Sequence, residues 1–132
     1  MKNLIFLFTL FFFQLGFSQQ TEFLKIKNYK VATLSDSLRE TSGLNFFKGK
    51  LYTFNDGGNS SEIFEIDKSS GKILQTFKTN LKNKDWEAIT SDSANIYIGD
   101  FGNNLGTRKD LKIYKIGLDS VDSASSVNNA QE

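Results

Sequence analysis

The chain has 132 residues and a formal net charge of +1, with neither histidine nor cysteine. A near-neutral chain without a basic run gives no electrostatic reason to expect binding to nucleic acid or to an anionic membrane. The missing residue types exclude disulfides, thiol chemistry and a Ser–His–Asp triad within the chain, which leaves carboxylates, amides, hydroxyls, lysine and arginine for any reaction.

Residues 1–18 have the layout of a secretory signal peptide. Lys2 is the basic residue, an apolar run extends from Leu4 to Phe13, and the small residues Gly16 and Ser18 follow. The apolar run is much shorter than the ~20 residues that a membrane-spanning helix needs. We therefore predict cleavage after Ser18 and a secreted or periplasmic protein that has no membrane attachment after cleavage.

The rest of the chain has the pattern of strands and turns. Short runs rich in β-branched and aromatic residues alternate with clusters of Gly, Asn, Asp and Ser, and no sustained helical periodicity is present. The predicted strands are residues 29–34, 43–47, 50–55, 62–67, 73–78, 87–91, 95–100 and 111–116. Residues 106–110 are predicted to form a solvated hairpin tip, and the polar residues 118–132 a flexible tail.

Two passages of the sequence match each other. KLYTFNDGGN (50–59) resembles NIYIGDFGNN (95–104), with Asp56 in the place of Asp100, and upstream Glu40 corresponds to Glu87. A period of about 45 residues with four short strands is typical of a β-propeller blade. We therefore predict an all-β fold whose residues 19–117 form propeller-type four-stranded antiparallel blades, about two of which are present. A β-sandwich is the alternative, but it gives no reason for turn chemistry to repeat in register.

The motifs ETSGL, LYTFND, IFEIDKSSGKIL, DWEAI and IYIGDFGN occur in this order. They resemble the N-terminal blades of secreted bacterial propellers of the SdiA-regulated family, which is more distantly similar to gluconolactonase, strictosidine-synthase-like and phytase-like propellers. The resemblance covers about residues 29–117 and implies a full ring, usually six-bladed. Here the second blade stops after three strands. We expect a fragment of a longer propeller, or else open sheet edges that pair with another chain.

Four carboxylates are the candidate metal ligands. Glu40 and Glu87 begin the predicted inner strands, and Asp56 and Asp100 end the next strands beside Gly–Asn loops. Hard oxygen ligands beside flexible backbone suit Ca²⁺, although the spacing is not that of an EF-hand. For the two aspartates, hydrogen bonds within turns are the favoured interpretation. For the two glutamates, a structural role and a ring around a cation both stay open.

Trp86 lies between two acidic residues in a predicted strand. A ligand-stacking platform is one interpretation, but a buried wedge between the two blades is favoured, because a tryptophan there would dominate the packing. No catalytic or cofactor-binding residue is assigned.

The predicted function is a secreted binding or scaffold module of unassigned ligand. Its partners would be the remaining blades of the same propeller, or another chain that pairs through an open sheet edge. The alternative is a divalent-metal-dependent hydrolase with inward carboxylates as ligands. That alternative comes from the resemblance to lactonase- and phytase-like propellers, and we do not expect this chain to be an enzyme by itself.

Overall fold

The computed structural model describes residues 22–117 and 126–127. The predicted signal peptide and most of the predicted tail lie outside the described residues. The chain divides into two units, residues 1–30 and 31–132, and the described part of the first contains the short 3₁₀ helix η1 (Ile26–Tyr29). No helix in the described part of the chain has the length and apolar character needed to cross a membrane.

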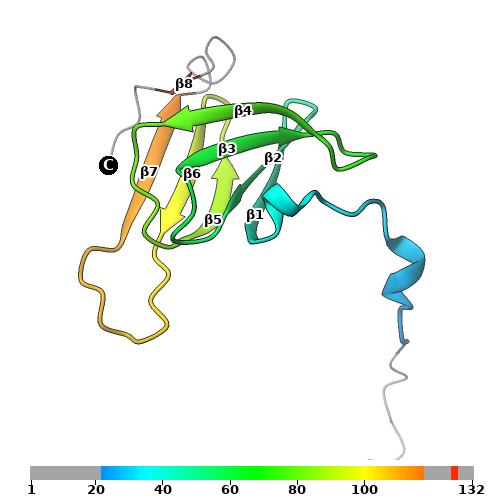
Figure 1. The fold of residues 1–132 in the computed structure, drawn as a ribbon, viewed down its shortest axis with the longest axis horizontal. Helices are drawn as coiled ribbons and strands as arrows, with labels where there is room; N and C mark the ends of the chain where they lie inside the picture. The colour runs from blue at the N-terminus through cyan, green and yellow to red at the C-terminus, as the bar shows by residue number, and fades with distance from the viewer. Residues whose placement is uncertain (1–21, 118–125, 128–132) are drawn as a thin grey trace, which may run out of the picture. The chain divides into compact units, whose positions relative to one another are not determined.

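The first sheet of the second unit is an antiparallel meander in chain order (Figure 1). Its strands are β1 (Thr41–Phe47), β2 (Lys50–Asn55), β3 (Glu62–Ile66) and β4 (Ile73–Thr79), and the two-residue β8 (Ser126–Val127) pairs in parallel with β4. β1 turns directly into β2 at Lys48 and Gly49, which both have positive φ, as tight hairpins require.

The second sheet has three antiparallel strands, also in chain order. They are β5 (Trp86–Ser91), β6 (Asn95–Asp100) and β7 (Lys112–Gly117). The turn between β5 and β6 is held by Asp92, whose carboxylate accepts hydrogen bonds from the backbone N–H groups of Ala94 and Asn95. A longer connection, residues 101–111, joins β6 to β7. The predicted all-β class is confirmed: one blade-like sheet has four antiparallel strands, β1 to β4, to which β8 adds in parallel, and the other has three, β5 to β7.

The predicted strand at residues 29–34 is wrong. Its first residue ends η1, and the others precede a second short 3₁₀ helix, η2 (Asp36–Leu38), in irregular backbone. The apolar alternation of this segment serves packing instead, because Leu34 and Leu38 lie against Phe64 and Ile66. These contacts cover one face of the first sheet, which we call its rear face.

The main core lies between the two sheets. We call the opposite face of the first sheet its forward face, and it carries the core residues Tyr52, Phe54, Ile63 and Phe77. This face packs against one face of the second sheet, which we call the rear face of that sheet and which carries Trp86, Ile96, Ile98, Tyr114 and Ile116. Successive side chains of a strand point to opposite faces of its sheet, so only every second residue of a strand contributes to this core. Trp86 is completely buried and meets Phe54 edge-on at 5.4 Å between ring centroids. The predicted role of Trp86 as a wedge between the sheets is confirmed.

Two polar contacts join the sheets along the β1–β5 seam. The Ser42 hydroxyl donates a hydrogen bond to the Trp86 carbonyl at 2.7 Å, and the Asn45 amide donates one to the Ser91 hydroxyl at 3.0 Å. At Gly43 an added Cβ would lie 2.8 Å from the Phe54 ring, so a glycine is needed where the seam is tightest. The first strands of the two sheets therefore lie side by side.

Candidate functional site

Strand pairing determines which residues of the two sheets are equivalent. Thr41 pairs with Asn55 in the first sheet as Trp86 pairs with Asp100 in the second, and both sheets have a register shift at the next position. The offset is 45 residues for both members of the pair.

The carbonyls that accept the corresponding loop hydrogen bonds have the same offset, whereas the donors, Asp56 and Gly102, are 46 residues apart. Asp56 N donates to the Glu40 carbonyl at 2.8 Å, and Gly102 N donates to the Asp85 carbonyl at 3.0 Å. Glu40 is therefore equivalent to Asp85, and Asn55 to Asp100. The correspondences predicted from sequence, Glu40 with Glu87 and Asp56 with Asp100, are wrong, because they aligned similar turn residues and not the hydrogen-bonded strands.

Asp100, one of the four predicted ligands, is completely buried. Its Oδ1 accepts a hydrogen bond from the backbone N–H of Asp85 at 3.0 Å and forms an ion pair with Arg108 Nη1 at 2.9 Å. Arg108 also donates to the carbonyl of Gly102. Asp100 thus fastens the long β6–β7 connection to the start of β5, a structural task. Residues 106–110 are not a simple solvated tip, since Arg108 points back to the sheet.

Glu40 and Asp56 hold the loop that follows β2. Glu40 Oε2 accepts a hydrogen bond from the Asn59 side-chain amide at 2.7 Å. Asp56 Oδ1 accepts one from the backbone N–H of Gly57 at 2.6 Å. The Asp56 contact is the local turn chemistry expected of an aspartate, whereas the Glu40 contact joins two residues that are 19 positions apart in the chain.

A carboxylate cluster is formed by Asp56, which follows β2, Asp85, which precedes β5, and Glu87, which lies on β5. One oxygen of each lies within 4.8 Å of the others. At Gly57 and Gly102 an added Cβ would collide with Asp85, so the two glycines leave the room that this residue occupies. Of the four predicted ligands, the structure therefore brings Asp56 and Glu87 together, and it adds Asp85, which was not among them.

The electrostatics of this carboxylate cluster are unfavourable in the absence of a counter-charge. Burial raises the pKa of Glu87, and the charges of Asp56 and Asp85 raise it further. Three carboxylate oxygens are the kind of donor set that Ca²⁺ prefers. Glu40 and Asp100 lie outside this set, because Asn59 and Arg108 hold their carboxylates.

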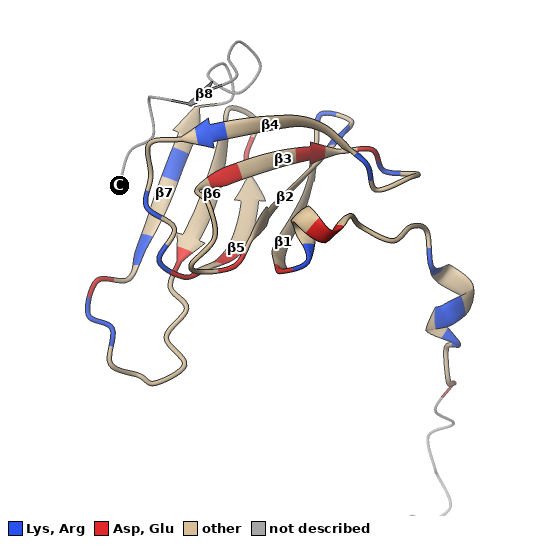
Figure 2. Ribbon diagram, viewed as in Figure 1, with Lys and Arg blue, Asp and Glu red and all other residues tan. Residues whose placement is uncertain are grey.

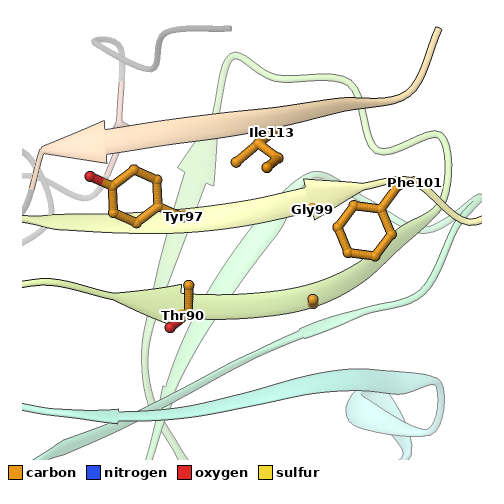
Figure 3. Close-up of a pocket in the computed structure, with 6 residues that line it drawn as sticks. Thr90, Tyr97, Gly99, Phe101 and Ile113 are labelled. Carbon is orange, nitrogen blue, oxygen red and sulfur yellow. The ribbon is translucent and has the colours of Figure 1, made fainter.

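The forward face of the second sheet contains an open apolar hollow (Figure 3). Its volume is about 330 Å³, and it is lined by Ala88, Thr90, Tyr97, Gly99, Phe101 and Ile113. The Phe101 ring lies over Gly99, where an added Cβ would collide with it. Sequence reasoning did not identify this hollow, although strand alternation places Tyr97 and Gly99 on one face of β6, with Phe101 directly after the end of that strand.

The equivalences place this hollow where the first sheet has its core. Tyr97 corresponds to Tyr52 and Gly99 to Phe54, so the Phe101 ring covers the position of the Phe54 side chain. Through the pairing of the third strands, Ile113 corresponds to Ile63. Phe54 and Ile63 are completely buried, whereas Phe101 is 42% exposed and Ile113 58% exposed. The same surface is covered in one sheet and open in the other.

Comparison with known proteins gave no match, either to a family model or to a curated protein. The resemblance to SdiA-regulated propellers therefore stays a prediction from the sequence.

Proposed function

We propose that the chain is a binding or scaffold module that acts outside the cytoplasm, and that the forward face of its second sheet packs against a further β-sheet, as blades pack in a propeller. The observation that supports this is the contrast between equivalent faces. Tyr52, Phe54 and Ile63 are covered by the second sheet, whereas on the equivalent face Ile113 and the Phe101 ring that lies over Gly99 are exposed.

The energetic argument follows from the area that such packing removes from water. Complete burial of one large apolar side chain contributes roughly 1.5–3 kcal/mol. In the first sheet Phe54, Ile63 and Phe77 are completely buried, so these side chains already make this contribution to stability. Covering Ile113, Phe101 and Tyr97 would contribute a term of the same kind, which is a driving force for association.

The occupant is a β-sheet with an apolar, partly aromatic face. The rear face of the second sheet is the template, since Trp86, Ile98 and Tyr114 cover the first sheet in this way. In a solution of the purified chain alone, the rear face of each second sheet is already covered by the first sheet, so the available β-sheet face is the forward face of the second sheet of another copy. The expected consequence is self-association through the open face.

Sedimentation velocity over a wide range of concentrations tests this proposal. The wild type should self-associate as its concentration rises, and Ile113→Lys should shift the protein to monomer while its circular dichroism is unchanged. Leu74→Lys is the matched control, because Leu74 on β4 is 61% exposed and lies outside the hollow. A chain that stays monomeric at all concentrations, or an Ile113→Lys variant that associates like the wild type, contradicts the proposal.

The divalent-metal-dependent hydrolase stays a prediction from sequence. The observation in its favour is the carboxylate cluster of Asp56, Asp85 and Glu87. Its test is the effect of Ca²⁺ on stability, which is argued in the Discussion.

A further inference from the structure

The outer edge of β7 differs from the equivalent edge of β3. β3 pairs with β2 on one side and with β4 on the other. Among the described residues β7 pairs with β6 alone and ends its sheet. An edge strand presents a row of backbone N–H and C=O groups that can pair with another strand.

The charges on the two equivalent strands are opposite. Register makes Glu62 equivalent to Lys112 and Glu65 to Lys115, so that EIFEI in β3 becomes KIYKI in β7. Figure 2 shows the acidic residues on β3 and the basic residues on β7. The apolar positions between them are kept as Ile63 and Ile113. A strand that pairs with β7 must therefore carry charges opposite to those of the strand that pairs with β3, and it must carry similar apolar side chains.

In the first sheet, β4 meets this requirement for β3. Lys78 lies opposite Glu62, and Phe77 lies opposite Ile63. Opposite charges in directly facing positions stabilise a strand pair, and like charges destabilise it. A strand like β4 would place a lysine against Lys112, so β7 favours a strand of the opposite charge.

We propose that the β7 edge binds an extended acidic strand, with Asp or Glu opposite Lys112 and Lys115 and a large apolar side chain opposite Ile113. The partner is a peptide segment that extends the second sheet by one strand. This inference rests on the part of the proposed function that makes the chain a binding module, and it does not require the forward face to pack against another sheet. The apolar side chain of the incoming strand corresponds to Phe77 and extends the same forward face.

Fluorescence anisotropy with labelled peptides tests the inference on the full chain, below the concentration at which it self-associates. The acidic probe is the β4 sequence with Glu in place of Gln75 and Lys78, ILETFET, and the basic probe is ILKTFKT. We expect the acidic probe to bind more tightly, by roughly a factor of 1.5 to 5 for each charge pair. Lys115→Glu should reverse the preference.

Backbone pairing is tested separately from charge. Two further acidic probes carry N-methyl groups on alternate residues, one set on each edge of the strand. One of the two should lose binding and the other should keep it, because a β-strand donates hydrogen bonds to β7 from one edge only. Equal loss with both probes, no loss with either, or equal affinity for acidic and basic peptides overturns the inference.

The same experiments separate the two proposals. If the acidic probe does not bind but Ile113→Lys still abolishes self-association, the edge inference is wrong and the proposed packing of the face stands. If the probe binds but the chain never self-associates, the packing proposal is wrong and β7 is a peptide-binding edge.

Discussion

Arg108 and Asp100 form an ion pair at 2.9 Å in which the carboxylate is completely buried. Arg108 reaches this position from the long connection after β6, and it also contacts Asp110, whose pKa is lowered to about 2 by Lys84 and Arg108. The connection is therefore tied to the sheet by charge, next to the hollow and the carboxylate cluster.

Arg108→Ala should destabilise the protein strongly, because it leaves the buried Asp100 carboxylate without its counter-charge. Removal of one partner of a buried pair costs about 3–5 kcal/mol, and the partial exposure of Arg108 places the expected value near the lower end. Urea unfolding followed by circular dichroism measures the free energy of unfolding.

Two variants control this measurement. Lys109→Ala changes an exposed neighbour of Arg108 and should alter the stability by less than about 0.5 kcal/mol. Adding Asp100→Asn to Arg108→Ala removes the unpaired charge and should recover part of the loss. If the double variant is as unstable as the sum of the single variants, the two side chains are not coupled.

Substitution of Trp86 should separate shape from hydrogen bonding in the main core. Its Nε1 is buried and has no hydrogen-bond partner in the described part of the chain. Trp86→Phe therefore removes an unpaired donor, which offsets part of the cavity cost, whereas Trp86→Ala should cost about 3–5 kcal/mol. Thermal melting of both variants gives the comparison. Equal losses would mean that a phenyl ring in place of the indole restores none of the packing between the sheets.

Seven strands, β1 to β7, were predictable from the sequence because their side-chain pattern is local, and they lie within a few residues of the predicted runs. β8 (Ser126–Val127) was not predicted, because it lies in the segment expected to form a flexible tail. Residues 29–34 have the same local pattern, but tertiary packing of Leu34 on the rear face of the first sheet decides their conformation. A strand also needs a neighbour to pair with, and that is not encoded in its own residues.

The carboxylates were only partly predictable. Two of the predicted ligands, Asp56 and Glu87, lie in the cluster. The place of Asp85 in it was not predictable, because the register shift at the start of β5 and the packing of Gly57 and Gly102 around Asp85 depend on the three-dimensional arrangement. Asp100 and Asp56 have similar neighbours in the sequence and both precede a turn, yet only Asp100 forms an ion pair with Arg108.

The pH dependence of stability should reveal the repulsion within the carboxylate cluster. The pKa of Glu87 is raised above its ordinary value of 4.5, so the folded chain holds this proton more tightly than the unfolded chain. The resulting stabilisation is fully present below pH 4.5 and is lost as the pH rises through the raised pKa. Glu87→Gln, which resembles the protonated form, should melt at a higher temperature than the wild type at pH 7 without added metal.

The comparison is made from melting temperatures between pH 4 and pH 8. The difference between Glu87→Gln and the wild type should grow across this range, because only the wild type gains a charge there. A difference that is constant with pH would show that Glu87 is not repelled by Asp56 and Asp85.

Calcium should act on the same three residues. A cation bound among Asp56, Asp85 and Glu87 relieves their repulsion and stabilises the folded chain by ~2.7 kcal/mol at a hundredfold excess over Kd. We expect Ca²⁺ to raise the melting temperature of the wild type and EDTA to reverse the rise. Glu87→Gln should lose the response, and Glu40→Gln should keep it, because the Glu40 carboxylate is held by Asn59 outside the cluster. Loss of the response in both variants would instead support the ring of glutamates predicted from sequence, and no response in the wild type would exclude a calcium site at this cluster.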